Sequence, residues 1–230
     1  MKILFACLFV LAFLSCNKKN LLLKEGSISL VKGNVFTEAK TGKHEKKSTP
    51  LHLGDKVHTG ETIVTGEASV AILDLGAVQV EIQHNTKFTL EALESNAQVY
   101  LQEGSVWTHA DKLQPMQKFA LRTPNTIAAV RGTKFYTSTD GKTTGTCHCK
   151  GKIAFKNNIS GYENINDSDY QLFYRDKKAV KVTPDDQRRW GITPTHNHSE
   201  IENSPLGKKN TLTAAEIAKI KSYIEKQFNL

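Results

Sequence analysis

The stretch Ala68–Ile82, which reads ASVAILDLGAVQVEI, decides the fold class of this 230-residue chain. In its second half, Val78–Ile82, apolar residues alternate strictly with Gln79 and Glu81. A period of two residues is typical of a strand that buries one face and exposes the other. A further apolar run precedes it, separated by Asp74-Leu75-Gly76. The stretch therefore predicts β structure.

Short β-favouring runs of the same kind fill the chain from Gly26 to Phe155, on both sides of this stretch. So many strands at short spacing, with no helical periodicity between them, predict an all-β fold. A β-sandwich and a β-roll remain equal alternatives, and the strand order stays open. Between the runs, Lys40–Pro50 carries five basic residues and is expected to be a solvated loop. The remaining runs lie at 27–31, 34–37, 53–57, 61–66, 86–90, 99–101, 106–109, 118–122 and 134–137.

The sequence changes character after Phe155. Residues 26–156 are expected to form the β domain, and 157–212 an irregular extension of it. The extension holds, in order, a polar loop at 157–169, a short hairpin at 170–182, a helical turn at 183–187 and a connector at 193–212.

Residues 213–230 predict an amphipathic helix at the end of the chain. Thr213-Ala214-Ala215-Glu216 has the spacing of a capping box. We expect the apolar face to pack on the β domain; a helix that binds a partner is the alternative. The residues on that face are Ile217, Ile220, Ile224 and Phe228.

The first residues have the pattern of a secretory signal. Lys2 precedes the apolar run Ile3–Leu14, which is shorter than the roughly 20 residues that a membrane-spanning helix needs. The ending Phe13-Leu14-Ser15-Cys16 resembles a lipobox, so residues 1–15 are expected to be removed and Cys16 to be acylated. Residues 16–25 then form the lipidated cysteine and its tether. An ordinary secretory signal and an uncleaved anchor are the alternatives.

The expected product is an exported lipoprotein, anchored in a membrane of the cell envelope and facing the periplasm or the outside. Its formal charge is +8, but the basic residues are scattered along the chain. They form no basic stripe interleaved with aromatic residues, so the sequence does not predict binding to nucleic acid. Attraction to an anionic lipid or wall surface is a weaker alternative.

Several motifs between residues 26 and 156 resemble the FecR domain family. They include a Leu-x-x-Gly-Asp turn, a Gly-Ser-Val-Trp element, and a Thr-Pro followed by Val-Arg-Gly-Thr. The resemblance implies a β domain whose glycines and Arg131 serve the strand connections; anion binding by Arg131 and Thr133 is the alternative. The motif residues are Gly33–Val35, Leu51–Gly60, Thr65–Leu73, Asn85-Thr86, Gly104–Trp107, Thr123-Pro124 and Val130-Arg131-Gly132-Thr133.

The resemblance also implies a role in envelope signalling. Relatives of the ferric-citrate regulator span the inner membrane, act on a sigma factor inside, and contact an outer-membrane transducer outside. This chain is expected to lack the cytoplasmic segment and the spanning helix. What carries over is an interaction module for an unidentified envelope protein, and the sequence predicts no oligomeric state.

One group of residues has the composition of a metal site. Cys147 and Cys149 are two residues apart in a predicted strand, which places both thiols on one face. With His196 and His198 they would complete a Cys₂His₂ zinc site. The alternatives are two small buried side chains beside a surface loop, or a redox-active thiol pair.

No grouping of residues predicts an enzyme. The G-x-S-x-G, H-E-x-x-H and phosphate-loop motifs are absent from the sequence. Three functions therefore remain: a FecR-like interaction module, a metal-binding or metal-sensing lipoprotein, and a structural lipoprotein that meets anionic polymers.

Overall fold

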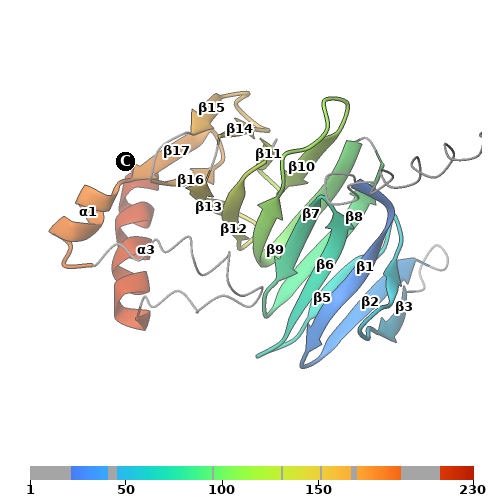
Figure 1. Ribbon diagram of the computed structural model, residues 1–230. Helices are drawn as coiled ribbons and strands as arrows, with labels where there is room; N and C mark the ends of the chain where they lie inside the picture. The colour runs from blue at the N-terminus through green and yellow to red at the C-terminus, as the bar shows by residue number, and fades with distance from the viewer. Residues whose placement is uncertain are drawn as a thin grey trace, which may run out of the picture.

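The computed structural model describes residues 22–40, 46–94, 96–130, 132–150, 152–166, 170–192 and 213–230. Seventeen strands account for most of these residues, and helices α1 (Pro184–Arg189) and α3 (Ala214–Phe228) follow them (Figure 1). The prediction of an all-β fold with a C-terminal helix is confirmed.

The strands form two sheets that share strand β9 (Asn96–Ala110). Sheet A has the order β4-β1-β6-β7-β9-β12-β13-β16-β17. Sheet B has the order β3-β2-β5-β8-β9-β10-β11-β14-β15. The other strands of sheet A are β4 (Lys56–Val57), β1 (Leu22–Lys32), β6 (Val70–Gly76), β7 (Val78–Ile82), β12 (Lys134–Thr139), β13 (Thr143–Lys150), β16 (Gln171–Arg175) and β17 (Lys178–Val182). Those of sheet B are β3 (Lys46–Pro50), β2 (Val35–Lys40), β5 (Thr62–Thr65), β8 (Thr86–Ala92), β10 (Lys118–Arg122), β11 (Thr126–Val130), β14 (Ile153–Asn157) and β15 (Glu163–Asn166).

Strand β9 changes sheets at Gly104. Its first half pairs with β8 and runs parallel to β10, and its second half pairs with β7 and β12. Gly104 has φ +96°, and a Cβ atom there would lie 2.5 Å from the Cα of Thr86. Only glycine combines this backbone conformation with so close an approach, so Gly104 permits the crossing.

After β9 the chain advances by hairpins that alternate between the sheets. β10–β11 lies in sheet B, β12–β13 in sheet A, β14–β15 in sheet B and β16–β17 in sheet A. Each hairpin pairs with the previous hairpin of its own sheet, through β11–β14 and β13–β16. The layers are therefore those of a sandwich, and the chain follows the path of a roll, so both expected architectures describe part of the structure.

The two sheets enclose one apolar core. Side chains of sheet A and of sheet B belong to the same buried cluster, in which the alternating residues of Val78–Ile82 face inward as expected. Burial of such side chains contributes about 1.5–3 kcal/mol each. Fully buried members include Leu73, Val80, Ile82, Val106 and Phe135 from sheet A and Ile63, Phe88, Leu121 and Phe155 from sheet B.

Helix α3 covers the outer face of sheet A at β16 and β17. Ile220, Ile224 and Phe228 pack in a second buried cluster that includes Val180 and Val182. The predicted capping box is present, because Thr213 accepts a hydrogen bond from the Glu216 N–H while the Glu216 carboxylate accepts one from the Thr213 N–H. The predicted apolar face is right at three positions, but Ile217 is 40% exposed because the cluster ends at Ile220.

Two segments that were expected to be loops contain strands. Strand β3 lies within Lys40–Pro50 and pairs with β2, and β15 lies within Asn157–Asp169 and pairs with β14. In both cases the free edge of a neighbouring strand supplies ladder hydrogen bonds, which outweigh an unfavourable local composition. The hairpin and the helical turn expected after residue 170 are present as β16–β17 and α1.

Candidate functional site

The Thr-Pro motif forms a buried polar cluster between the sheets. The Thr144 hydroxyl donates to the Thr123 Oγ1 at 2.8 Å and lies 2.5 Å from the Asn125 Oδ1. The Thr126 N–H donates to the Thr123 Oγ1 at 3.0 Å. All four residues are buried. Since their polar groups bond to one another, this part of the motif serves the fold; Pro124 lies beside it and is exposed.

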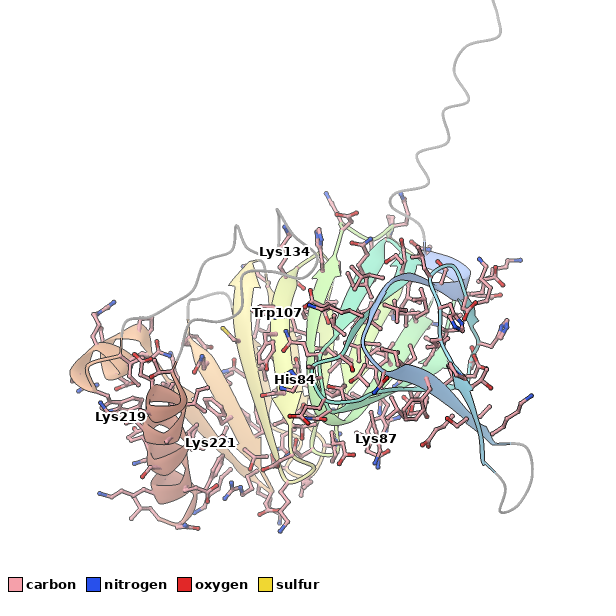
Figure 2. The ribbon with its side chains drawn as sticks, turned by 90° about the horizontal axis from the view of Figure 1, so that it is seen from below. His84, Lys87, Trp107, Lys134, Lys219 and Lys221 are labelled. Carbon is pink, nitrogen blue, oxygen red and sulfur yellow. The ribbon has the colours of Figure 1, made fainter. Side chains whose placement is uncertain are left out.

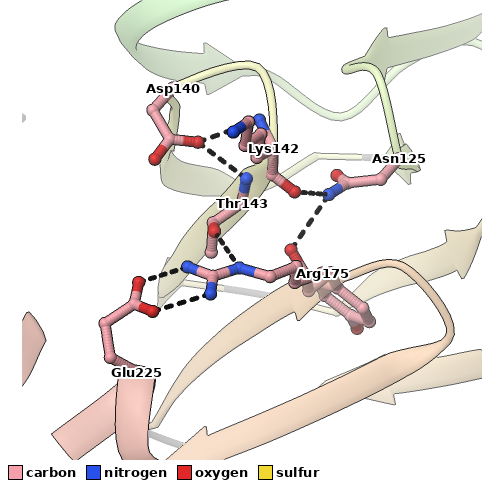
Figure 3. A network of polar contacts seen from close by, with 7 residues as sticks. Asn125, Asp140, Lys142, Thr143, Arg175 and Glu225 are labelled. Carbon is pink, nitrogen blue, oxygen red and sulfur yellow. Dashed lines mark hydrogen bonds and ion pairs between the residues drawn. The ribbon is translucent and has the colours of Figure 1, made fainter. Parts of the chain in front are cut away.

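The same cluster extends towards helix α3 (Figure 3). Asn125 donates its amide hydrogens to the carbonyl oxygens of Lys142, at 2.8 Å, and Tyr174, at 3.0 Å. Arg175, the next residue, donates to the Thr143 hydroxyl at 2.7 Å and binds the Glu225 carboxylate with both Nη atoms. The hydrogen bond from Arg175 lowers the pKa of Glu225. The cluster therefore fixes the hairpin on which α3 packs.

The Val-Arg-Gly-Thr part of the motif lies where the chain passes from β11 to β12. Gly132 has φ +110°, and a Cβ atom on it would meet the Lys112 backbone at 3.0 Å. Val130 and Thr133 are buried, and the Thr133 carbonyl accepts the Ala110 N–H. These contacts favour the structural reading of the motif. Arg131 lies outside the described residues, so its predicted role stays a prediction.

A row of side chains crosses the outer face of sheet A, away from the core. The pairs Glu81–Trp107, Trp107–Tyr136, Tyr136–Cys147 and Cys147–Gln171 lie directly opposite each other on neighbouring strands. Opposite residues of paired strands share a face. We call these five residues the aromatic row; with strands about 4.8 Å apart it spans roughly 19 Å.

The centre of the aromatic row is an aromatic pair. The ring centroids of Trp107 and Tyr136 are 4.7 Å apart and the rings are tilted by 52°. Both side chains are half-buried, although the positions on either side of them along the strand belong to the core face. Figure 2 shows Trp107 over the sheet, between helix α3 and the N-terminal strands. A tryptophan in this position offers a large apolar surface together with an N–H donor.

Polar groups flank the aromatic pair. Glu81 is only 9% exposed, and burial raises its pKa to about 7 against a hydrogen bond with Gln83 that lowers it. Burial also raises the pKa of Tyr136, while a hydrogen bond with Ser105 lowers it and the nearby Cys147 raises it. Ser105 in turn donates to the Gln83 Oε1 at 3.1 Å. The row thus combines apolar contact area with a carboxyl group that changes charge near neutral pH.

Of the four predicted metal ligands, the structure places Cys147 in the aromatic row, where it is buried. The predicted strand is present, but Cys149 is the extra residue of a β-bulge, since Lys150 opposes Lys134 and His148 opposes Phe135. A bulge changes the backbone geometry locally, and the expectation that both thiols lie on one face stays a prediction.

The other metal ligands cannot be placed in the same way. The side chain of Cys149 and both His196 and His198 lie outside the described part of the chain. Within that part, no group of three or more His, Cys, Asp or Glu side chains converges. The four-ligand site therefore remains a prediction.

Cys16 also lies outside the described residues. Among the helices of the described part, none has the length and apolarity to cross a membrane.

Sequence reasoning did not single out Glu81, Trp107 and Tyr136 as a site. One signal was present: in Ser105–His109 the core residues are Val106 and Thr108, so alternation places Trp107 outward. The register of β7, β9 and β12 places Trp107 opposite Glu81 and Tyr136. No local pattern in the sequence encodes this register.

Comparison with known proteins supports the family resemblance. Residues 61–154 match the family model FecR, described as FecR protein. This match confirms a FecR-family domain in that segment and includes both Glu81 and the aromatic pair. No curated protein matches the chain.

Two matching solved structures are both of a candidate anti-sigma factor from Parabacteroides distasonis ATCC 8503. In each case the TM-score is 0.47 and the identity 14%, and the likeness covers 56% of this chain and 62% of that chain. The chain therefore spans less than two thirds of these proteins, and a likeness of this size carries no argument about function.

Proposed function

We propose that this chain is an exported, non-catalytic interaction module of the bacterial cell envelope, which works in envelope signalling by binding a partner through its aromatic row. One observation carries the proposal: Trp107 and Tyr136 lie side by side on the outer face of sheet A, within the segment that matches FecR.

The position of the aromatic pair supports a binding role over a purely structural one. Large aromatic side chains contribute most to stability in a protein core and to affinity in an interface. Trp107 instead lies on the face that points away from the core cluster. Tryptophan and tyrosine are the side chains most often found at the energetic centre of protein interfaces.

The neighbouring groups restrict the kind of partner. Glu81 beside Trp107 favours a partner that brings a hydrogen-bond donor or a cation to an apolar contact. A protein segment meets this requirement, and so does a wall polymer with amide groups. The FecR match favours the protein, because the family resemblance implies contact with an envelope signalling protein.

Membrane attachment is a separate part of the proposal. Acylation of Cys16 would hold the domain at a membrane, since two or three acyl chains anchor a protein without a spanning helix. Metabolic labelling with a palmitate analogue tests this directly. Label on the wild-type chain and none on Cys16→Ser supports the anchor, and a soluble, unlabelled wild-type chain refutes it.

The binding proposal is tested with a photoreactive amino acid placed next to the aromatic pair. We expect cross-links to an envelope protein from position 107 and none from position 100, because Tyr100 lies on the outer face of the other sheet. Trp107→Ala should weaken binding of that protein by roughly 30-fold or more, the effect of removing an interface hot spot of about 2 kcal/mol. The matched control, Tyr100→Ala, should leave binding unchanged.

Two results contradict the proposal. The melting temperature of Trp107→Ala is measured together with its affinity, so that loss of binding is interpreted only in a folded variant. Unchanged affinity in a folded Trp107→Ala variant would refute the role of the aromatic row. Sedimentation of the wild-type domain with purified peptidoglycan, with no protein cross-link, would identify a polymer as the partner instead.

A further inference from the structure

Two arginine side chains of this chain are each held by an aromatic ring together with a glutamate carboxylate. On the outer face of sheet B, the Arg122 guanidinium lies 5.6 Å from the centre of the Tyr100 ring. Its Nη1 donates to the two carboxylate oxygens of Glu91 at 2.9 and 3.0 Å. The three residues come from the neighbouring strands β8, β9 and β10. Arginine suits this setting, because its planar guanidinium both stacks on a ring and pairs with a carboxylate.

The second case joins sheet A to helix α3. The Arg175 guanidinium lies 4.8 Å from the centre of the Phe228 ring, and it binds the Glu225 carboxylate with both Nη atoms (Figure 3). A lysine over a ring is handled differently: Lys181 lies 3.8 Å from the centre of the Tyr170 ring, and no carboxylate of the described residues pairs with it. In this chain the combination of a ring and a glutamate therefore holds arginine.

Glu81 and Trp107 form a third pair of a glutamate and an aromatic ring, and no arginine of the described residues lies on it. The two residues are directly opposite each other on β7 and β9. Glu81 is buried, and its hydrogen-bond partner is the neutral Gln83. A carboxylate accepts up to about four hydrogen bonds, and its burial without a counter-ion is costly. The pair therefore lacks the cation that completes the other two.

Two basic side chains lie one row away on the same face of sheet A. His109 and Lys134 are opposite each other on β9 and β12. His109 pairs with Asp111 at 3.6 Å. The pKa of Glu81 responds to its burial and to Gln83, and to neither of these basic groups. The carboxylate of Glu81 is therefore not neutralised by its basic neighbours.

We propose that the aromatic row binds an arginine side chain of its partner, with the guanidinium stacked on the Trp107 ring and paired with the Glu81 carboxylate. This inference rests on the proposed function, since it assigns one chemical group of the partner that binds there. Trp107 is half-buried, so part of its ring is open to a partner. A guanidinium is attracted to a ring whose centre lies within about 6 Å, and neighbouring strands are about 4.8 Å apart. One arginine side chain therefore reaches both groups.

The two outer faces of β9 show why this arginine comes from another molecule. On sheet B, Arg122 lies directly opposite Tyr100 and completes the site from within the chain. On sheet A, the position directly opposite Trp107 is Tyr136, which enlarges the aromatic surface and supplies no positive charge. The site on sheet A is therefore complete only when a partner brings the guanidinium.

The probes are three tripeptides with blocked ends, Gly-Arg-Gly, Gly-Lys-Gly and Gly-citrulline-Gly, which are titrated into the full-length chain. Citrulline has nearly the shape of arginine without its charge. The chain has two tryptophans, so labelling with nitrogen-15 tryptophan gives two indole signals, and Trp107→Ala assigns them. Trp190 packs on Tyr223 beside α3 and is the internal control. The titration is made at about pH 8, because burial raises the pKa of Glu81 to about 7 and the carboxyl group must be ionised.

We expect the arginine peptide to shift the Trp107 signal with a saturable Kd of about 1 mM, and to leave the Trp190 signal in place. The lysine and citrulline peptides should bind at least about ten-fold more weakly. Glu81→Gln, which keeps the size of the side chain, should lower the affinity for the arginine peptide by at least about ten-fold. The matched control is Glu103→Gln, which should bind as the wild type does, because Glu103 already pairs with Lys87 at 2.7 Å.

The inference is overturned if the arginine peptide does not move the Trp107 signal, or if the lysine or citrulline peptide binds as tightly. Equal affinity of the wild type and Glu81→Gln also overturns it. The proposed function fails by a different result, unchanged affinity of Trp107→Ala for the cross-linked envelope protein. Loss of that affinity together with an unmoved Trp107 signal would reject the arginine and leave the proposed function standing.

Discussion

Replacing Gly104 by alanine tests whether the crossing of β9 between the sheets depends on close backbone approach. A Cβ atom at this position would lie 2.5 Å from the Cα of Thr86 and 2.7 Å from the carbonyl oxygen of Asn85. Thr86 is fixed in turn, because its hydroxyl accepts the Ser105 N–H at 3.0 Å. The clash is therefore with backbone that is already held in place.

The expected loss has two parts. A left-handed backbone conformation costs alanine about 1–2 kcal/mol relative to glycine. Insertion of a methyl group into filled space costs a further ~1–3 kcal/mol. The lower entropy of the unfolded alanine chain returns about 0.4–1 kcal/mol. We expect Gly104→Ala to lower the free energy of unfolding by about 2–4 kcal/mol, as the balance of these effects.

Gly54→Ala is the matched control. Gly54 has φ +90°, close to that of Gly104, but nothing lies within 4 Å of the added Cβ atom. It should lose about 1 kcal/mol or less, because only the backbone conformation and the unfolded-state entropy contribute. Urea unfolding followed by circular dichroism measures both variants. Equal losses for Gly104→Ala and Gly54→Ala would refute the reasoning, since close approach would then contribute nothing.

Three further predictions follow from the structure and the sequence. Burial raises the pKa of Glu81 from 4.5 to about 7, so the folded state holds its proton more tightly than the unfolded state. The stability this confers is complete below pH 4.5 and is lost as the pH rises to about 7; thermal melts of Glu81→Gln should lack this slope. Ile224→Ala should cost about 2–4 kcal/mol in urea unfolding, and Ile217→Ala less than about 0.5 kcal/mol; similar losses would contradict the packing of α3. If the predicted zinc site forms, elemental analysis should find about one zinc per chain, lost together with thermal stability in Cys147→Ser/Cys149→Ser; a metal-free wild type with unchanged stability in the variant would exclude it.

Local patterns in the sequence predict the elements of this fold well. The alternation in Val78–Ile82 places its apolar residues in the core, and the spacing of Thr213 and Glu216 marks the start of α3. These features depend on neighbours within a few residues, which a sequence displays directly. The β3 and β15 strands escaped prediction because the partner strand, and not local composition, stabilises them.

The candidate site was harder to predict, because it depends on register. Glu81, Trp107 and Tyr136 are more than twenty residues apart from one another, and only the pairing of β7, β9 and β12 brings them together. The cysteines depend on register as well. Cys147 lies on the outer face of sheet A, and the backbone of Cys149 lies at a register shift that no local pattern reveals, so a shared face for the two thiols stays a prediction.

The alternation of hairpins between the sheets sets a rule for how this fold can change in length. Deleting one hairpin, such as β12–β13, would leave β11 followed by β14 and deliver two successive hairpins to sheet B. Deleting two successive hairpins keeps the alternation, because a hairpin of one sheet is then still followed by a hairpin of the other sheet. Relatives of this domain are therefore expected to differ from it by an even number of hairpins, whatever number of residues they gain or lose.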